Sequence, residues 1–339
     1  MRRLGAIPAM DEGAAELAVR ARRTGSRPGE LADALKQGDV IKAFAFRGAT
    51  HYLTPEEGGA YLALRASGRQ WELPSWRQYY RLEPADWGAF REAVRDALAD
   101  GPLTVPELGA AVTRRAAYRH LRPVFDEGVG TFFKPLTWQG DMSFGPPRDG
   151  QATFQRLDRN PRWRGVWDVD DAGPHAITSY LQTYGPATHG HVHRWLGDGL
   201  SAGRKRLDAW LTQLRDRLEA VDVEGTTAYV LAEDLDDLVA TPPTDAVRLL
   251  PGHDQWVMGP GTKDEQVVPP ARRNVVTRKA NLIVAGGLVS GTWSIGGDQV
   301  ELRWFGERGP APGEALDAEV SRLATLLERP LTPTLRTER

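Results

Sequence analysis

The order of secondary-structure elements is decided around residues 101–108, which read GPLTVPEL. Gly101 can end a preceding helix, and Thr104 with Glu107 matches the capping box that begins the next one. Apolar residues at helical spacing flank this turn, and two short strand-like runs follow. Helix, tight turn, helix, helix and hairpin, in this order, predict a winged helix-turn-helix. Besides the helix that begins at the turn, the elements are expected at residues 86–99, 116–127, 131–136 and 141–145.

A second copy of the turn occurs in Gly185-Pro186-Ala187-Thr188, and the elements around it repeat the same order. The copy is preceded by a helix and followed by a short helix through Val192 and Trp195. A basic helix that Ser201 is expected to cap comes next. Two matching turns between matching elements predict a second winged helix. Its first helix and the two strands of its wing are expected at residues 177–184, 218–223 and 226–231.

The two ends of the chain have different patterns. Near the N-terminus, two amphipathic helices precede a strand-like stretch, and a further helix restarts at Thr54. Residues 281–305 read as a β-meander with Gly-Gly turns, and a closing helix follows. The sequence therefore predicts an α+β fold of tandem winged helix-turn-helix units followed by a β-rich C-terminal part. The expected units are 1–84, 85–172, 173–242 and 243–339, with linker candidates at 146–151 and 241–245.

Composition excludes several classes of protein. The 339 residues contain no cysteine, which excludes disulfides, thiolate metal sites and a cysteine nucleophile. No apolar run reaches the roughly 20 residues of a membrane helix, and the N-terminus lacks a secretory pattern. No P-loop, Rossmann or nucleophile-elbow motif is present. We expect a cytoplasmic protein that does not bind membranes.

Positive charge is clustered although the formal net charge is −2. Such clusters are either solvated helix faces or surfaces that attract phosphate. Two clusters fall on helices placed like recognition helices, and Arg47, next to the break in the strand-like stretch at Gly48, adds a further candidate. The residues expected to contact DNA are Arg47, Arg114, Arg115, Arg119, Arg204, Lys205 and Arg206.

Several motifs together resemble the AlkZ-type (YcaQ-like) family of winged-helix DNA glycosylases. Residues 47–53 (RGATHYL) are similar to its Arg-Gly-Thr-x-His element, and 184–188 (YGPAT) to its Tyr-Gly-Pro-Ala-Thr turn. Residues 249–254 (LLPGHD) with Gly259, and 286–293 ending in Gly-Thr-Trp, resemble its C-terminal elements. The resemblance implies three tandem winged helices, a β-rich C-terminal part and a DNA-sized concave surface.

The resemblance fails at the positions that carry catalysis. The family's active enzymes have Gln-x-Gln or Gln-x-Asp ahead of the first helix, and Pro8 and Met10 occupy those two places here. Hydrolysis of an N-glycosidic bond needs an oriented water and a polar group near an oxocarbenium-like sugar. Proline offers no polar side-chain atom, and methionine only a weak acceptor. Asp11 could substitute as the catalytic group, or it could cap the following helix.

Other residues allow two interpretations each. His51 could contact a flipped nucleotide or hold a backbone carbonyl. His189 and His193 could share a metal or form a polar face, and no acid or cysteine completes a metal set, so we expect no metal and no cofactor. Asp254 could pair with His253 or fix a turn. An aromatic stretch could stack a base or pack in the core: Trp71, Trp76, Tyr79 and Tyr80.

These observations predict a monomeric protein that binds double-stranded DNA, damaged DNA included, with weak or no base excision. One alternative is an active DNA glycosylase, a repair hydrolase that releases alkylated purines or opens crosslinks. The other is a transcriptional regulator or interaction protein that keeps winged helices as a scaffold.

Overall fold

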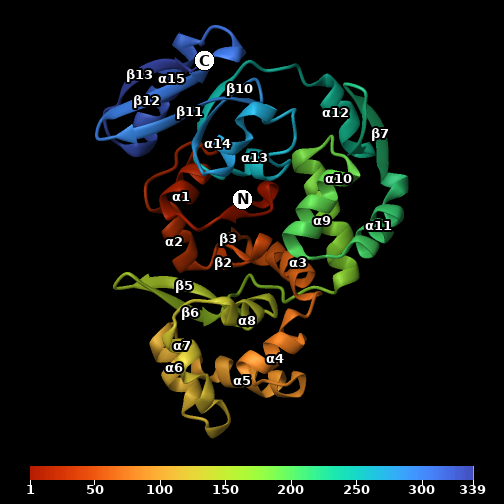
Figure 1. Ribbon diagram of the computed structural model, residues 1–339, viewed down its shortest axis with the longest axis vertical. Coiled ribbons are helices and arrows are strands. Elements are labelled where there is room, and N and C mark those ends of the chain that lie inside the picture. Colours follow the sequence, from red (N-terminus) through yellow and green to blue (C-terminus); the bar gives the residue numbers. More distant parts are fainter. Residues whose placement is uncertain (339) are drawn as a thin grey trace. The chain divides into compact units, whose positions relative to one another are not determined.

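The computed structural model describes residues 1–338, which form two compact units (Figure 1). Unit 1 contains residues 1–6, 32–183 and 188–218, and unit 2 contains residues 7–31, 184–187 and 219–338. Within residues 1–338, no helix has the length and apolar character that crossing a membrane requires. The fold is α+β, and its β-rich part is C-terminal, as the sequence predicts.

A winged helix-turn-helix lies in unit 1 where the sequence predicts it. Helix α5 (Trp87–Ala97) leads through the short strand β4 (Leu103–Thr104) into α6 (Val105–Thr113). The wing is the hairpin of β5 (Met142–Arg148) and β6 (Gln151–Arg156), and β4 pairs with β6. The capping box is confirmed, because the Glu107 carboxylate accepts a hydrogen bond of 2.8 Å from the Thr104 backbone N–H.

Residues 131–136 were predicted as a strand, and this prediction is wrong. They form a 3-10 turn, η6 (Thr131–Phe133), and the start of α8 (Lys134–Trp138). Phe132, Phe133 and Leu136 are all buried. A short apolar run that is buried on every side has the same pattern in a strand and in a helix, so periodicity could not separate them.

Two further predictions for this winged helix need correction. The basic helix expected over 116–127 is divided into η5 (Ala116–Leu121) and α7 (Arg122–Asp126). Residues 146–151 are not a linker. They form the tip of the β5–β6 hairpin, where Asp149 and Gly150 have φ values of 50° and 75°. The Pro-Gly composition reflects the turn and not a boundary between domains.

The wing strands belong to a larger sheet in unit 1. The strands of unit 1 in this sheet run in the order β3-β2-β5-β6-β4, with β2 (Ile41–Phe44) and β3 (Thr50–Leu53) antiparallel. The long helix α3 (Pro55–Ala66) follows β3. The other elements before α9, with α2 extending across the boundary between the units, are η1 (Arg2–Leu4), α2 (Glu30–Gln37), η2 (Phe46–Gly48), η3 (Gln70–Glu72), α4 (Pro74–Tyr80), η4 (Pro84–Asp86) and η7 (Leu157–Arg159).

The helices of the second predicted winged helix are also present. They are α9 (Val169–Tyr184), α10 (His189–Val192), a π-helical turn η8 (His193–Asp198), α11 (Arg204–Gln213) and η9 (Arg215–Arg217). Ser201 does not cap α11 as predicted, because the helix begins two residues later and its N-cap is Gly203, with a φ of 83°. Figure 1 shows α11 beside α9 and α10, at a distance from α6 and α7.

Unit 2 is built on a five-stranded sheet with the order β13-β12-β11-β10-β9. The predicted meander is confirmed, with β10 (Asn281–Ala285), β11 (Leu288–Gly296) and β12 (Gln299–Phe305) antiparallel. Strand β9 (Val247–Leu250) adds to one edge, and β13 (Thr332–Glu338) pairs in parallel with β12 at the other. Neither edge strand was predicted from the sequence.

Alternate residues of these strands point to opposite faces of the sheet, and a hydrophobic core lies on each face. The first contains Val247, Leu249 and Ile283 and is covered by helix α15 (Gly313–Leu327). The second contains Leu250, Leu282 and Val284. The period of two places a core on both faces. The remaining elements are β1 (Ile7–Pro8), α1 (Glu12–Arg20), the wing strands β7 (Leu218–Val223) and β8 (Thr226–Leu231), η10 (Ala232–Asp234), α12 (Leu235–Ala240), α13 (Gln255–Met258), η11 (Pro270–Arg272), α14 (Arg273–Thr277) and η12 (Gly306–Arg308).

Candidate functional site

The segment between β2 and β3 presents Arg47 at the surface of unit 1. Arg47 and Gly48 both adopt left-handed backbone conformations, with φ values of 53° and 69°. The turn is closed by a hydrogen bond of 2.9 Å from the Ala45 N–H to the Ala49 carbonyl. A non-glycine residue with positive φ is strained, and such strain gathers at binding sites. The exposed Arg47 is therefore held in a defined position at the tip of a short turn.

His51 lies at the base of this turn and is buried. Its Nδ1 is 3.0 Å from the carbonyl oxygen of Ala49, and a carbonyl can only accept, so Nδ1 carries the hydrogen. Burial lowers the pKa of His51 to about 4, and the nearby charge of Arg47 acts in the same direction. The ring is therefore neutral at physiological pH and keeps Nε2 as an acceptor. The structural interpretation, that His51 holds a backbone carbonyl, is confirmed.

An aromatic cluster connects the turn to the second set of helices in unit 1. The ring of Phe46 stacks on Trp195 of η8, with centroids 4.1 Å apart. His51 and Tyr61 contact the same phenyl ring, each with a centroid separation of 5.5 Å. Aromatic contacts of this kind fix the orientation of the segment that carries them. The position of Arg47 is thus set by packing from β3, α3 and η8 together.

Of the basic residues near η5, Arg115 differs from the other two. All three side chains are exposed. Arg115 forms an ion pair with Asp96 at 2.7 Å, whereas Arg114 and Arg119 form none with any residue from 1 to 338. An exposed pair contributes little to stability and can be exchanged for a phosphate contact. The structure thus places these side chains where a charged ligand can reach them.

The basic residues of α11 lie in its first turn. Arg204, Lys205 and Arg206 are exposed and form no ion pair with another described residue. The N-terminal end of a helix carries partial positive charge, so three cations at this end oppose the helix dipole. These cations do not stabilise the helix, but they would attract an anionic ligand. The opposite side of the helix anchors it through the buried side chains of Leu207, Trp210 and Leu211.

Residues 7–11 include Pro8 and Met10, the two positions that the resemblance predicts as catalytic, and they belong to unit 2. Pro8 is half-buried and Met10 is 57% exposed. Asp11 is the N-cap of α1, accepting a hydrogen bond of 3.0 Å from the Ala14 N–H. Its second oxygen binds Lys279 Nζ at 2.9 Å. These two bonds hold the pKa of Asp11 below its usual value. The capping interpretation is confirmed, and both carboxylate oxygens are engaged.

Asp254, from the LLPGHD element, is buried and also caps a helix. Its carboxylate accepts from the Trp256 N–H at 2.8 Å, at the start of α13. It also forms a bidentate ion pair with Arg22, with distances of 2.8 and 2.5 Å. His253 is not a hydrogen-bond partner of Asp254 in the described chain. The prediction that Asp254 fixes a turn is confirmed, and Arg22 is a partner that no sequence pattern had indicated.

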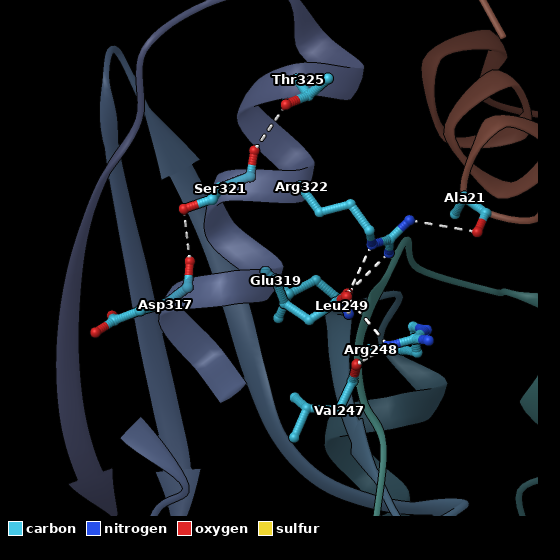
Figure 2. Close-up of polar contacts among 9 residues, drawn as sticks. All are labelled: Ala21, Val247, Arg248, Leu249, Asp317, Glu319, Ser321, Arg322 and Thr325. Carbon is cyan, nitrogen blue, oxygen red and sulfur yellow. Dashed lines mark hydrogen bonds and ion pairs between the residues drawn. The ribbon is translucent and has the colours of Figure 1, made fainter. Parts of the chain in front are cut away.

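Arg22 directly follows the C-terminal end of α1, and a second polar cluster holds the same end of the helix (Figure 2). The carboxylate of Glu319 on α15 accepts from Arg322 at 2.8 Å and from the backbone N–H of Leu249 at 3.1 Å. Arg322 also donates to the carbonyl of Ala21, at 3.3 Å. Together with Asp254, this cluster connects the segment after residues 7–11 to the C-terminal sheet.

Several residues of the C-terminal motifs have structural roles. A Cβ on Gly259 would lie 2.2 Å from the ring of Tyr184, so only glycine permits this contact. The indole N–H of Trp293 donates to the carbonyl of Leu250 at 2.9 Å. These motifs therefore hold unit 2 together, which explains their residue types without a catalytic role.

The histidine and aromatic candidates are mostly structural. No group of three metal-binding side chains occurs within residues 1–338. His193 Nε2 lies 2.8 Å from Asp208, and His191 accepts from the Thr188 N–H in the capping box of α10. Trp71 is buried, which supports core packing, whereas Tyr79 is 64% exposed.

Comparisons with known proteins relate this chain to one family. A family model described as DNA glycosylase AlkZ-like matches residues 1–326. The interstrand DNA cross-link repair glycosylase of Streptomyces sahachiroi is 34% identical over 291 residues, covering 84% of this chain and 78% of that protein. The solved structure of Streptomyces sahachiroi DNA glycosylase AlkZ matches with a TM-score of 0.91 at 32% identity, over 99% of this chain and 92% of that one. The chain belongs to the AlkZ-like DNA glycosylase family.

Proposed function

We propose that this protein binds duplex DNA, damaged duplex included, and excises bases weakly or not at all. The observation that carries the binding proposal is the first turn of α11, where three exposed cations oppose the helix dipole. Cations in this arrangement favour a ligand with closely spaced negative charges, and the DNA backbone is such a ligand. Exposed Arg47, Arg114 and Arg119 add further contacts in the same unit.

The proposal of weak excision rests on residues 8–11. Base release requires a water to attack C1′ of the sugar while the base leaves, and the water must be held by a polar group. Pro8 and Met10 cannot hold it. Asp11 caps α1 and pairs with Lys279, so recruiting it as a base would break both bonds. Losing water positioning and cation stabilisation each removes on the order of 10²-fold in rate.

A second candidate function is base excision by a catalytic group outside residues 8 and 10. The 34% identity to an interstrand cross-link repair glycosylase favours it. In this case Asp11 would leave its capping position when DNA binds. Asp11→Asn would then abolish excision. The amide keeps the size of the side chain and an acceptor oxygen, but it lacks the negative charge that a catalytic base needs.

One experiment separates these functions. Equilibrium binding and release of base or crosslink would be measured on the same duplexes, containing N7-alkylpurine, N3-alkylpurine or an interstrand crosslink. We expect binding that weakens as salt rises, with release near background. Brisk release that Asp11→Asn abolishes would establish the second candidate, and brisk release unaffected by Asp11→Asn would locate catalysis elsewhere. Absence of binding at low salt would refute both and favour an interaction protein.

A further inference from the structure

Unit 1 contains two partly or fully buried cations with no acidic partner. Arg65 on α3 is only 9% exposed, and Lys134 at the start of α8 is half-buried. Neither forms an ion pair with a carboxylate of the described chain. Arg65 donates to the Ser201 hydroxyl and stacks on the ring of Trp138 at 4.5 Å, but its buried Nε has no hydrogen-bond partner. The ammonium group of Lys134 lies over the ring of Phe44, 5.4 Å from its centroid.

Both cations face the same glycine. A Cβ built on Gly48 would lie 3.1 Å from Lys134 Nζ and 3.7 Å from Arg65 Nη2. The space that a side chain at Gly48 would fill is therefore bordered by both groups. Burial lowers the pKa of both, and the charge of Arg65 lowers that of Lys134 further. Two like charges that are close together and partly shielded from water are unfavourable for the unliganded protein.

We propose that Arg65 and Lys134, meeting at Gly48, form a binding site for one phosphodiester group of DNA. This inference rests on the proposed function and adds a specific contact to it. A phosphate would satisfy the free donors and remove the repulsion between the two cations. Its charge is delocalised over non-bridging oxygens, which suits two donors that approach from different elements.

The surroundings favour a DNA phosphate over a free anion. Gly48 directly follows the exposed Arg47. Ser201, which accepts from Arg65, lies three residues before the exposed Arg204 of α11. The two cations thus lie between two segments that are proposed to contact DNA. A strand passing from one to the other would bring a phosphate to this point.

The decisive variant is Lys134→Gln. Arg65 is a poorer choice for substitution, because it also packs on Trp138 and its removal would disturb the fold. Lys134→Arg keeps the charge. Lys36→Gln is the matched control, since Lys36 is an exposed lysine of the same unit with no described ion pair. Without DNA, Lys134→Gln is expected to raise Tm, because it relieves repulsion with Arg65. A lysine with a merely structural role would lower Tm when replaced.

DNA binding should change in the opposite direction. For an undamaged 20-bp duplex, we expect Lys134→Gln to weaken binding about tenfold at low salt, the effect of one lost charge-assisted contact. The slope of log K against log salt should fall by about 0.9, as for one phosphate. Lys134→Arg and Lys36→Gln should retain the natural slope. Neutral methylphosphonate, scanned along the duplex, should identify one position that weakens the natural protein and not Lys134→Gln.

The outcomes separate this site from the proposed function. If the natural protein binds duplex and Lys134→Gln changes neither affinity nor slope, the phosphate site is refuted while DNA binding stands. If Lys134→Gln lowers Tm, the repulsion argument is refuted. If inorganic phosphate raises Tm of the natural protein alone while DNA binding is unchanged by the variant, the site takes a free anion. If the natural protein binds no DNA, the proposed function itself is refuted.

Discussion

Replacing Asp254 with alanine would remove two interactions at once, the bidentate pair with Arg22 and the N-cap of α13. The Asp254 side chain is fully buried, whereas that of Arg22 is 27% exposed. Leaving one member of a buried pair unpaired costs about 3–5 kcal/mol, and the exposure of Arg22 puts this pair below that range. A lost N-cap adds about 1 kcal/mol. We therefore expect Asp254→Ala to reduce the free energy of unfolding by about 3 kcal/mol.

Thermal and urea unfolding would test this value. For a unit of this size, about 3 kcal/mol corresponds to a fall in Tm of roughly 6–12 °C. Arg22→Met measures the other half of the pair, and the double variant completes the cycle. We expect the two losses to be non-additive by about 1.5 kcal/mol or more. Asp245→Ala, at an exposed aspartate, is the control and should stay within about 0.5 kcal/mol. Additive losses in the cycle would refute the claim that the pair acts as a unit.

Three further predictions concern DNA, pH and catalysis. Charge reversal of Arg204 and Arg206 should weaken binding to all duplex sequences about equally, and a change in sequence preference in a binding titration would contradict this. His51 has a pKa of about 4 when folded and of about 6.5 when unfolded, so the unfolded state takes up a proton first as pH falls. Stability should therefore fall by about 2 kcal/mol from pH 7 to pH 5, and urea unfolding of His51→Gln should lack most of this dependence. Glutamine at positions 8 and 10 together should raise release of alkylpurines above that of the natural protein, and an unchanged rate would show that the defect lies elsewhere.

The sequence predicted best those elements whose signals are local. The capping box of Thr104 and Glu107, the glycine turns of the meander and the N-cap at Asp11 are each decided by a few neighbouring residues, and all are present. Strand β13 was missed because Pro333 and its exposed neighbours do not alternate in hydrophobicity. The boundaries of the four sequential units stay a prediction.

Much of the candidate site could not be found in this way. Arg22 forms an ion pair with Asp254, which is 232 residues away in the sequence, and Lys279 binds Asp11, which is 268 residues away. Arg65 and Lys134 come from different helices, and their shared glycine gives no sign in the sequence of what faces it. Such contacts depend on tertiary packing and leave no periodic pattern. The roles of Arg47 and of the α11 cations remain predictions that binding experiments will test.

The composition of unit 2 has a consequence for the order of folding. Residues 7–31 pack with segments that the ribosome makes more than two hundred residues later, such as Asp254 and Arg322. Contacts of this separation form slowly, because a long loop must close before any of them is gained. Most of unit 1 emerges in between and can fold first. We therefore expect helix α1 to find its final place late, so that residues 7–11 become fixed only when synthesis of the C-terminal sheet is complete.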